Sequence, residues 1–485
     1  MSDAPDVFEA SRADKLRQTK ELGLDPWGGR FEGSQPISAI RALPTNQTPR
    51  PRVRAAGRIV LRRDMGRSHF LDIRDSTDRI QVHIGQKQIG DSWAFAQLVD
   101  LGDLLGVDGE FGATRTGELT IFADKLHPLG KSLLPHPDKH SGMQDVEFRL
   151  RHRYLDMIYN PEVLDRIQKR IKIVRCIRNY LDAQGFSEVE TPTLHAVAGG
   201  AAARPFITHH NALDIDLYLR IALELHLKRL LVGGIEKVYE VGRVFRNEGI
   251  SPKHNPEFTM LEVYQAYGDY RSMMDLTEGL VVACVESLGQ GLQLPYGEHV
   301  VDYAPPWQRA TYAELFEKHV GVSRFDTEAV RHVAGQAGIA TANKHPDVVV
   351  HQLFEERVEH KLTGPIFVYD YPASLCPLTK RKRDNPAVAE RFEPYVLGME
   401  IGNAYTELND PVTQEETFRL QLAGLPEEDS MARMDEDFVR ALRYGMPPAG
   451  GLGIGIDRLV MLLTNTQSIR DVILFPLLRP TAAKD

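Results

Sequence analysis

The chain contains few cysteines, and their spacing gives them no shared role. Only three occur in 485 residues, at Cys176, Cys284 and Cys376. No two have the short spacing of a zinc knuckle or a redox motif, so the sequence predicts neither disulfide staples nor a structural metal site. We interpret all three as buried, reduced thiols of a cytosolic protein.

Long apolar runs are also absent. The most apolar segment, near the end of the chain, is interrupted by Asp457 and Arg458 and is too short to span a membrane. The first residues carry acidic groups and no apolar core, unlike a secretory signal. We therefore expect a cytoplasmic protein without a membrane segment.

Positive charge is in the minority, but it is unevenly distributed. The formal net charge of −9 argues against a generic nucleic-acid binder, yet it does not exclude a local basic face. Basic residues outnumber acidic ones in one segment, which holds Arg50, Arg52, Arg54, Arg58, Arg62, Arg63, Arg67, Arg74 and Arg79 against Asp64, Asp72, Asp75 and Asp78. The whole-chain charge is a poor guide to what that segment binds.

The length predicts two to four domains, and a hydrophobic fraction of 42% with 26% charged residues is typical of a soluble globular protein. Residues 1–50 form the first part. A polar pattern from about residue 10 to residue 24 predicts a helix that ends near Gly23 and Pro26. A loop follows up to about Arg50.

Short alternating strands characterise residues 51–130. Turn formers separate them, at Met65-Gly66, Ser76-Thr77-Asp78, Asp108-Gly109 and Thr116-Gly117. About five strands in about 80 residues suit a small β-barrel of the oligonucleotide-binding (OB) kind. A different small barrel or sandwich would give a similar pattern.

Residues 131–160, with their prolines and histidines, are interpreted as a connector. Asn160-Pro161 then predicts a helix start, with an N-cap and a proline at the first position, and Gly185 predicts its end. Its expected apolar face holds Val163, Ile167, Ile171, Val174, Ile177 and Leu181. Strands and helices then mix without regular alternation, which favours an antiparallel α+β domain over 161–485.

One candidate site is a hairpin with charge at its mouth. The β-like run KVYEVGRVF leads into Arg246 and Glu248, then into a polar loop with His254 and Asn255, and a second run starts at Phe258. A planar guanidinium such as that of Arg246 suits a phosphate or carboxylate, and the Phe258 ring could stack on a base. An ordinary surface hairpin with salt bridges is the alternative.

Three glutamates, Glu393, Glu400 and Glu407, recur in a segment rich in apolar residues. They could line a solvated face. Because glutamates are rarely buried without a cation, the apolar neighbours favour instead a site for Mg²⁺ beside a nucleotide and for a cationic substrate.

The run GLGIGIDR opens into a helix but fits neither a Rossmann fingerprint nor a P-loop. Its glycines permit close backbone approach, and Arg458 follows where it could meet phosphate. A tightly packed strand–helix joint would use the same glycines.

Together these segments resemble the class II aminoacyl-tRNA synthetases, and among them the lysyl-tRNA synthetases of bacterial layout. Pro192 in TPTL matches motif 1, GRVFRNEGISPKHNPEF matches motif 2 and GLGIGIDR matches motif 3. GGAAARPF, HNPEFTMLEVYQAY, EIGNAYTELNDP and RDVILFP are similar to the lysyl family in particular. Ala404-Tyr405 stands where many bacterial members carry Gly-Phe. The resemblance covers about residues 12 to 480 and implies an OB-fold barrel followed by a class II antiparallel-sheet catalytic domain.

The resemblance also implies roles for individual residues, with Arg246 and Arg458 catalytic. It implies an ATP site of Arg246, Glu248, His254, Asn255, Phe258, Glu393 and Arg458. It implies Mg²⁺ ligands at Glu393 and Glu400. It implies a lysine site of Gly200, Glu224, Glu262, Tyr264, Asn403 and Glu407. It implies anticodon contacts by Arg58, Phe70, Gln81 and Glu118, although Phe70 could instead be barrel core.

The implied reaction fits these residue types. Lysine activation joins two anions, a carboxylate and the α-phosphate of ATP, so arginines and Mg²⁺ are needed to neutralise charge. The implied partners are tRNA(Lys), L-lysine, ATP and a second copy of the chain, with motif 1 at the dimer interface.

Three other functions are compatible with parts of the pattern. An aspartyl- or asparaginyl-tRNA synthetase would need a cation in its side-chain pocket, which Glu262 and Glu407 argue against. A lysine ligase that modifies a translation factor would usually lack the barrel. A catalytically inactive RNA-binding paralogue would be expected to lose some of Arg246, Glu248, Glu400 and Arg458.

Overall fold

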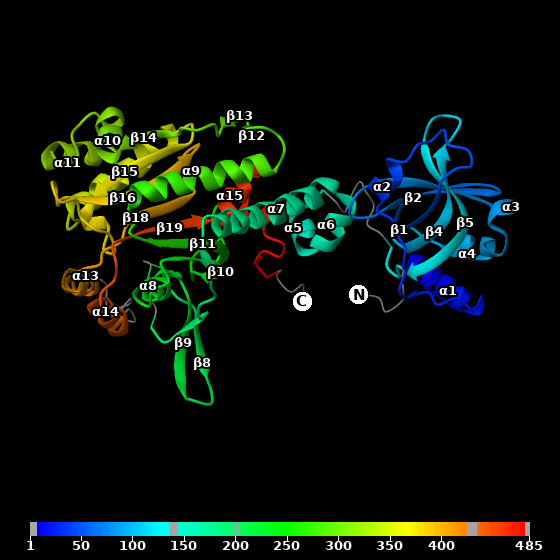
Figure 1. Cartoon of the computed structure of the whole chain (residues 1–485), viewed down its shortest axis with the longest axis horizontal. Coiled ribbons are helices and arrows are strands. Elements are labelled where there is room, and N and C mark those ends of the chain that lie inside the picture. Colours follow the sequence, from blue (N-terminus) through cyan, green and yellow to red (C-terminus); the bar gives the residue numbers. More distant parts are fainter. Residues whose placement is uncertain (1–6, 136–143, 198, 201–202, 424–433, 481–485) are drawn as a thin grey trace. The chain divides into compact units, whose positions relative to one another are not determined.

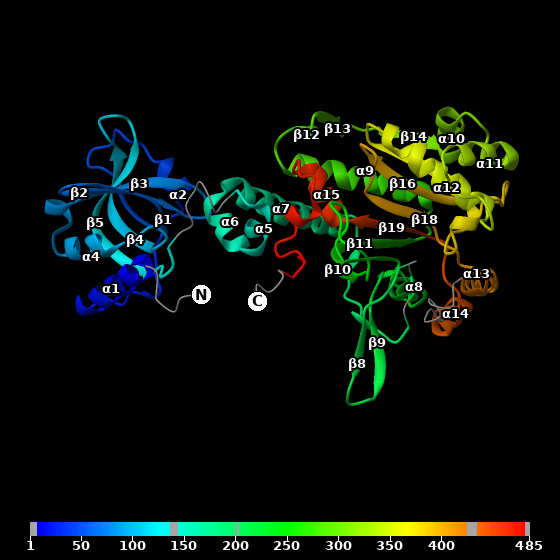
Figure 2. The same cartoon turned by 180° about the vertical axis from the view of Figure 1, so that it is seen from behind.

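The computed structural model describes residues 7–135, 144–197, 199–200, 203–423 and 434–480. The chain divides into two compact units, Met1–Gln144 and Asp145–Asp485, whose elements are traced in Figures 1 and 2. Of the expected connector 131–160, residues 136–143 lie outside the described residues, as do residues 1–6 of the N-terminal segment. Within the described ranges no helix has both the length and the apolar character to cross a membrane.

The first unit is a closed five-stranded barrel in the order β1-β2-β3-β5-β4. Its strands are β1 (Arg52–Met65), β2 (Ser68–Arg74), β3 (Arg79–Gly85), β4 (Leu104–Ala113) and β5 (Leu119–Gly130). Three of the predicted turns join consecutive strands. The fourth prediction was wrong, because Asp108-Gly109 lies inside β4 at a register shift against β5. A Cβ on Gly109 would lie 2.3 Å from the carbonyl oxygen of Phe122, so glycine serves close strand approach there.

Helices complete the core of this unit. They are α1 (Val7–Glu21), α2 (Ile37–Arg41), α3 (Gln86–Ile89) and α4 (Trp93–Leu98), with a 3₁₀ turn η1 (Gly90–Ser92). The predicted first helix is present and ends before Gly23. Ile37 and Ile40 of α2 are fully buried among the barrel side chains, so the N-terminal segment packs as part of the barrel unit.

The second unit is built on a nine-stranded sheet in the order β14-β15-β16-β18-β19-β11-β10-β6, with β17 paired to β16. The strands are β6 (Ser187–Glu188), β10 (Lys237–Phe245), β11 (Glu257–Ala266), β14 (Gln308–Thr311), β15 (Ile366–Pro372), β16 (Val388–Val396), β17 (Met399–Glu400), β18 (Gly402–Thr406) and β19 (Ala449–Gly455). The sheet is antiparallel, as expected, except at its two edges, where β14 pairs with β15 and β6 with β10 in parallel.

Two smaller sheets accompany it. One is β7-β9-β8, from β7 (Leu194–His195), β8 (Ile207–His210) and β9 (Ile215–Leu219); the other pairs β12 (Gln293–Tyr296) with β13 (His299–Asp302). In Figure 1 the β8–β9 hairpin projects from the body of this unit.

The helices of the second unit begin within the expected connector. They are α5 (Val146–Arg151), α6 (Arg153–Tyr159), α7 (Pro161–Ala183), α8 (Glu224–Val232), α9 (Tyr270–Ser287), α10 (Tyr312–Val320), α11 (Thr327–Gln336), α12 (Pro346–Arg357), α13 (Pro411–Ala423), α14 (Glu436–Arg443), α15 (Ile456–Leu463) and α16 (Ile469–Val472). Short 3₁₀ turns are η2 (Glu359–Lys361) and η3 (Ala373–Leu375).

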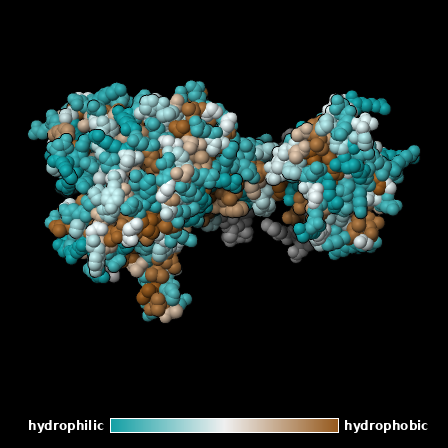
Figure 3. Space-filling view, in the orientation of Figure 1, coloured by the Kyte–Doolittle hydropathy of each residue, from teal (hydrophilic) through white to brown (hydrophobic). Residues whose placement is uncertain are grey.

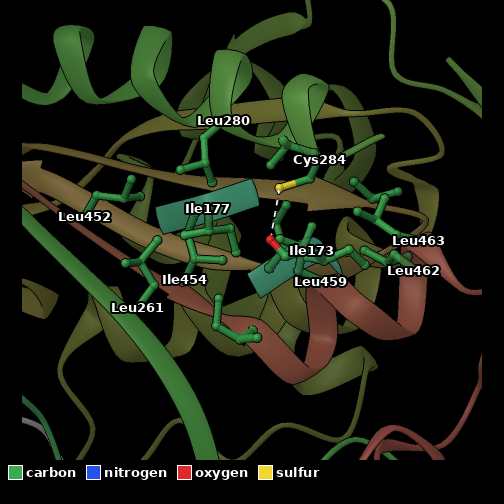
Figure 4. Packing of buried hydrophobic residues seen from close by; sticks show 14 of the residues in the cluster. Ile173, Ile177, Leu261, Leu280, Cys284, Leu452, Ile454, Leu459, Leu462 and Leu463 are labelled. Atoms are coloured by element: carbon green, nitrogen blue, oxygen red, sulfur yellow. Dashed lines mark hydrogen bonds between the residues drawn. The ribbon is translucent and has the colours of Figure 1, made fainter. Parts of the chain in front are cut away.

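Helices α7, α9 and α15 cover one face of the main sheet and form its principal core, part of which Figure 4 shows. Helix α7 begins at Pro161, as predicted. Its buried stripe differs from the prediction at one position, because Ile171 is 46% exposed whereas Ile173 is fully buried. The reason is the neighbour: α9 packs on the Ile173 side, where the thiol of Cys284 meets the Ile173 carbonyl at 4.0 Å.

Strand alternation determines which side chains reach the other face. On β11, Leu261 and Val263 enter the principal core. Because successive side chains of a strand point to opposite faces, Glu262 and Tyr264 lie on the opposite face of the sheet. Helices α8 and α14 pack on that second face, over a smaller apolar cluster.

Candidate active site and nucleic-acid face

The floor of the candidate active site is a strand without side chains on one face. Leu452 and Ile454 of β19 enter the core, so Gly451 and Gly453 face the other way. In register, Gly453 lies between Glu262 and Asn403, and Gly451 lies between Tyr264 and Tyr405. A Cβ on Gly451 would lie 1.9 Å from Glu407 Oε1, so this position cannot take any larger residue. The glycine motif therefore gives a strip of bare backbone across the sheet, which we call the trough, and the side chains of Glu407, Tyr264 and Met260 lie over it.

Three carboxylates are buried at one end of this trough. Glu224, Glu262 and Glu407 are 5%, 3% and 0% exposed. Glu262 accepts hydrogen bonds from the Leu223 amide at 3.0 Å and from the Tyr264 hydroxyl at 2.9 Å. The Tyr405 hydroxyl donates to Glu224 at 2.8 Å. The structure thus brings together Glu224, Glu262, Tyr264 and Glu407 as the sequence predicted.

A fourth charged group in this cluster was missed from the sequence. Lys228 is fully buried, and its Nζ lies 2.5 Å from Glu224 Oε1 and contacts Glu407 Oε2. Its spacing from Glu224 was a usable signal, since residues four apart on a helix lie side by side.

Burial and neighbouring charges shift the pKa values of Glu262, Glu407 and Lys228. Burial, followed by the charge of Glu224, raises the pKa of Glu262 to about 7. Burial also raises the pKa of Glu407 well above its usual value, with Lys228 opposing that rise. Burial opposes the charge of Lys228, but Glu224 and Glu407 together raise the pKa of Lys228. The pocket is therefore a strongly negative site with one internal cation.

Two further predicted residues, Gly200 and Asn403, border this pocket. Gly200 has a φ of +90°, which favours glycine, and a Cβ there would lie 3.9 Å from the Glu224 Cβ. Asn403 Oδ1 is buried without a hydrogen-bond partner among the described residues. Residues 201 and 202 of the predicted GGAAARPF segment lie outside the described residues.

The opposite end of the trough carries arginines. The Arg246 guanidinium lies 5.1 Å over the Phe258 ring, and burial lowers the pKa of Arg246. Arg458 donates to Glu400, to its carbonyl at 2.9 Å and to its carboxylate at 3.1 Å. A third contact of 3.2 Å joins Arg458 to His254.

Residues of the β10–β11 hairpin, which is present as predicted, complete this end. Glu248 is exposed in the connecting loop. The Asn255 amide nitrogen donates to the Glu257 carbonyl at 2.6 Å, while its Oδ1 finds no partner among the described residues. Asp457, next to Arg458, accepts hydrogen bonds from Arg170 at 2.5 Å and from the amide of Thr259, next to Phe258, at 2.7 Å. These bonds tie together the backbone segments that carry Arg458 and Phe258.

The predicted metal ligands differ in environment. Glu393 is buried and accepts from the hydroxyls of Tyr371 and Tyr395, each at 2.7 Å, and from Arg391. Burial works against ionisation, yet Arg391 and the two hydroxyls hold the pKa of Glu393 below its usual value. Burial and the charge of Glu393 raise the pKa of Glu400.

This donor set fits Mg²⁺ bound together with a nucleotide. Carboxylate oxygens are hard ligands that suit Mg²⁺, and the mutual repulsion of Glu393 and Glu400 would be relieved by a cation. The described residues contain no group of three or more His, Cys, Asp or Glu able to hold a metal. Phosphate and water oxygens would therefore complete the coordination, as is usual for Mg²⁺.

The barrel carries a row of rings across one face. In register, Arg63 of β1 pairs with Phe70, Phe70 with His83, and His83 with Phe122. The ring centroids of Phe70 and His83 are 4.9 Å apart, and those of His83 and Phe122 are 5.8 Å apart. Phe70 is half-buried and lies outside the barrel core, which excludes the core alternative.

Polar groups adjoin this row. Gln81 accepts from Arg63 at 2.9 Å and donates to Thr120 at 2.9 Å. Glu118, exposed at the start of β5, lies near Asp72, whose pKa is raised by burial and by that charge. The sequence prediction placed Arg58 here, but its guanidinium donates to the Gly102 carbonyl at 2.7 Å, and Arg63 adjoins Gln81 instead.

Comparisons with known proteins agree with this geometry. Residues 145–479 match a family described as tRNA synthetases class II (D, K and N), and residues 53–129 match an OB-fold nucleic acid binding domain. A "Lysine--tRNA ligase" of Pelotomaculum thermopropionicum is 51% identical, covering 97% of this chain and 94% of that protein.

Further relatives cover the chain as completely. A "Lysine--tRNA ligase" of Moorella thermoacetica is 50% identical over 99% of each chain. Another, of Shouchella clausii, is 46% identical over 97% of this chain and 96% of its own length. With its OB-fold barrel, its antiparallel catalytic sheet and these matches, the chain belongs to the class II tRNA synthetases, and within them to the lysine–tRNA ligase family.

Proposed function

We propose that this chain carries out the two-step reaction of a lysine–tRNA ligase, with the acidic end of the trough as its lysine pocket. In the first step a carboxylate oxygen of L-lysine attacks the α-phosphorus of ATP, and pyrophosphate leaves. In the second step a terminal ribose hydroxyl of tRNA(Lys) attacks the lysyl-adenylate, and AMP leaves. The observation that carries the proposal is the buried acidic cluster of Glu224, Glu262 and Glu407 beside the arginine end of one trough.

The charges of that cluster match lysine. Three carboxylates and the Lys228 ammonium sum to −2 when all are ionised. Lysine brings two ammonium groups, so binding neutralises the pocket. Glu224 with the Gly200 backbone takes the α-ammonium, and Glu407 with Tyr264 and Glu262 takes the ε-ammonium. An uncharged amino acid would leave a buried carboxylate unpaired, which is the basis of rejection.

The arginine end suits the triphosphate. Arg246 contacts the α-phosphate and, with Asn403, the lysine carboxylate; Arg458 holds the γ-phosphate. Both arginines neutralise charge that builds up as the two anions join. No protein nucleophile is needed, because positioning and electrostatics are sufficient for this transfer.

The adenine lies between hairpin groups. Phe258 stacks on the base, with the Arg246 guanidinium already 5.1 Å from the ring centroid. Glu248 accepts from the adenine amino group, and His254 with Asn255 supports the triphosphate. Glu393 and Glu400 would hold Mg²⁺, which supplies charge neutralisation to the phosphates when bound.

Two rival functions lose support from the geometry. An aspartate or asparagine ligase needs a cation facing the substrate side chain, but Lys228 is already paired with two carboxylates. An inactive paralogue would have no use for the buried and costly charges of the lysine pocket.

The barrel face suits single-stranded RNA. Rings in a row, Phe70, His83 and Phe122, can stack on unpaired bases, and the amide of Gln81 can read a base edge. Arg63 lies beside them, and Arg50 is 4.3 Å over the Phe122 ring. We assign the anticodon of tRNA(Lys) to this face, with Arg63 in the place expected for Arg58.

We propose that the chain forms a homodimer, and exposed apolar surface around motif 1 supports this proposal. Ile171 of α7 and Leu194 of β7 are each 46% exposed, and Leu213 at the tip of the β8–β9 hairpin is 65% exposed. Figure 3 shows apolar residues gathered on that hairpin. A second copy of the chain would cover them, since exposed apolar patches mark interfaces. The free thiols suit the reducing cytoplasm, where tRNA and ATP are present.

The reaction is tested by ATP–pyrophosphate exchange with each of the twenty amino acids, with Mg²⁺ and without tRNA. Exchange with lysine alone is expected. Glu407→Gln should raise the lysine KM by about 100-fold or more, because a buried charge pair is lost, and should change the ATP KM by about threefold at most. Exchange with aspartate or asparagine, or equal losses for both substrates in Glu407→Gln, would overturn the pocket assignment.

The raised pKa of Glu262 predicts a pH dependence. A group with a pKa of about 7 is protonated at pH 6 and ionised at pH 8, and a bound cation favours the ionised form. The kcat/KM for lysine should therefore rise about tenfold from pH 6 to pH 8. Glu262→Gln should flatten this profile. An unchanged slope in that variant would assign the dependence to another group.

The barrel face predicts a difference between two arginines. Arg63→Gln should raise the tRNA KM for aminoacylation about tenfold, reduce the salt dependence of tRNA binding, and leave lysine-dependent exchange unchanged. Arg58→Gln serves as the matched control, with a smaller effect on the tRNA KM. A larger effect at Arg58 would restore the original sequence prediction.

Sedimentation equilibrium at micromolar concentration tests the dimer. We expect a dimer mass for the wild type and a shift towards monomer in Leu213→Asp, because a charge at the hairpin tip cannot be buried cheaply. Val300→Asp, at an exposed apolar site on β13, is the control and should remain dimeric. A monomeric wild type would contradict the proposal.

A further inference from the structure

Lys228 is a buried charge that the lysine-activating reaction does not itself require. It lies on α8 and is 0% exposed, and it contacts two of the three carboxylates that the substrate would meet. Its ammonium also lies 5.6 Å from the Tyr405 ring centroid and 5.9 Å from that of Phe438 on α14. Every side of the ammonium is therefore closed by protein groups.

The contacts of Lys228 with Glu407 suggest what this buried charge does. Glu407 Oε2 forms a salt bridge with Lys228, whereas Glu407 Oε1 lies over Gly451, and neither oxygen accepts a hydrogen bond from any further group among the described residues. Gly451 makes room for that second oxygen, because Glu407 Oε1 lies only 1.9 Å from the place that a Cβ on Gly451 would take. One oxygen of Glu407 is thus used by an internal ammonium, and the other points into the trough.

We propose that Lys228 is a positioning and specificity-determining residue, a permanent internal cation that favours the ionised form of Glu407 and holds its carboxylate at the trough before lysine arrives. The proposal rests on the proposed function. The groups that face this cluster are Glu224 from α8, Glu262 and Tyr264 from β11, Tyr405 from β18, and Glu407 itself. Without Lys228 three carboxylates would share a buried pocket with no cation, and one of them would take up a proton.

That proton would have to leave when the substrate ammonium binds. Lys228 therefore sets the proton balance of lysine binding as well as the affinity. With Lys228 present, Glu407 is ready for a second cation. With Lys228 absent, lysine binding becomes coupled to the loss of about one additional proton.

The test is calorimetric titration of lysine into the full chain at pH 8.0, in buffers of different ionisation enthalpy. Lys228→Met should release about one more proton per bound lysine than the wild type. Its lysine KM should be raised about tenfold or more at pH 7 and should recover towards the wild-type value at pH 9, with the ATP KM nearly unchanged. Lys228→Arg should keep the wild-type proton count, and Lys318→Met, at an exposed lysine of α10, is the control.

If Lys228 had a purely structural role, the lysine KM and the proton count would respond differently. It predicts a lysine KM that rises equally at every pH and an unchanged proton count, and either result overturns the proposal. If Lys228→Met folds poorly, the melting temperatures of the single and double variants distinguish the two accounts. Adding Glu224→Gln removes the excess carboxylate and should recover much of the lost melting temperature, whereas no recovery contradicts the charge account.

The wild type separates this proposal from the proposed function. If the wild type shows no lysine-dependent pyrophosphate exchange, the proposed function fails, whatever the variants do. If it exchanges with lysine but Lys228→Met has the wild-type proton count, the assignment of Lys228 alone fails.

Discussion

The catalytic unit depends on the cost of holding like charges out of water. Three carboxylates are buried together, burial and the charge of Glu224 raise the pKa values of Glu262 and Glu407, and the removal of water strengthens the repulsion among the three. The Lys228 ammonium and the hydroxyls of Tyr264 and Tyr405 offset only part of that cost. The repulsion that these groups do not offset is relieved when a positively charged ligand binds. The pocket therefore selects a cationic amino acid.

The sheet makes this arrangement possible through simple alternation. On β19 the core side chains Leu452 and Ile454 alternate with glycines, so one strand both closes the apolar core and opens the trough. The trough has acids at one end and arginines at the other, joined by neighbouring strands of one rigid sheet. Such a scaffold fixes the distance between the acidic pocket and the arginine end without moving parts, which suits a reaction driven by positioning.

Much of this was predictable because the signals were local. Turn residues and side-chain periodicity predicted the β10–β11 hairpin, the start of α7 at Pro161, and three of the four turns between barrel strands. The acids of the pocket were also identified, since Glu407 stood among apolar residues and the motif resemblance assigned the rest. Each of these features depends on residues that lie close to it in the sequence.

The features that the sequence did not predict depend on contacts with residues far along the chain. Gly109 was taken for a turn because nothing nearby in sequence reveals that Phe122 presses on it from β5. The sequence near α7 does not show which of Ile171 and Ile173 is buried, because this depends on the side on which α9 packs. In sequence Lys228 looks like an ordinary helix pair with Glu224, because its second partner, Glu407, lies far along the chain.

The most direct measurement is the ratio of kcat/KM for L-lysine and for 6-hydroxynorleucine in ATP–pyrophosphate exchange. The two amino acids have the same length, and only the terminal charge differs. Because a neutral hydroxyl would leave the buried carboxylates without their second cation, the ratio should be about 1,000 or more in favour of lysine. A ratio near ten or below would show that the pocket selects shape and length, and it would contradict the account.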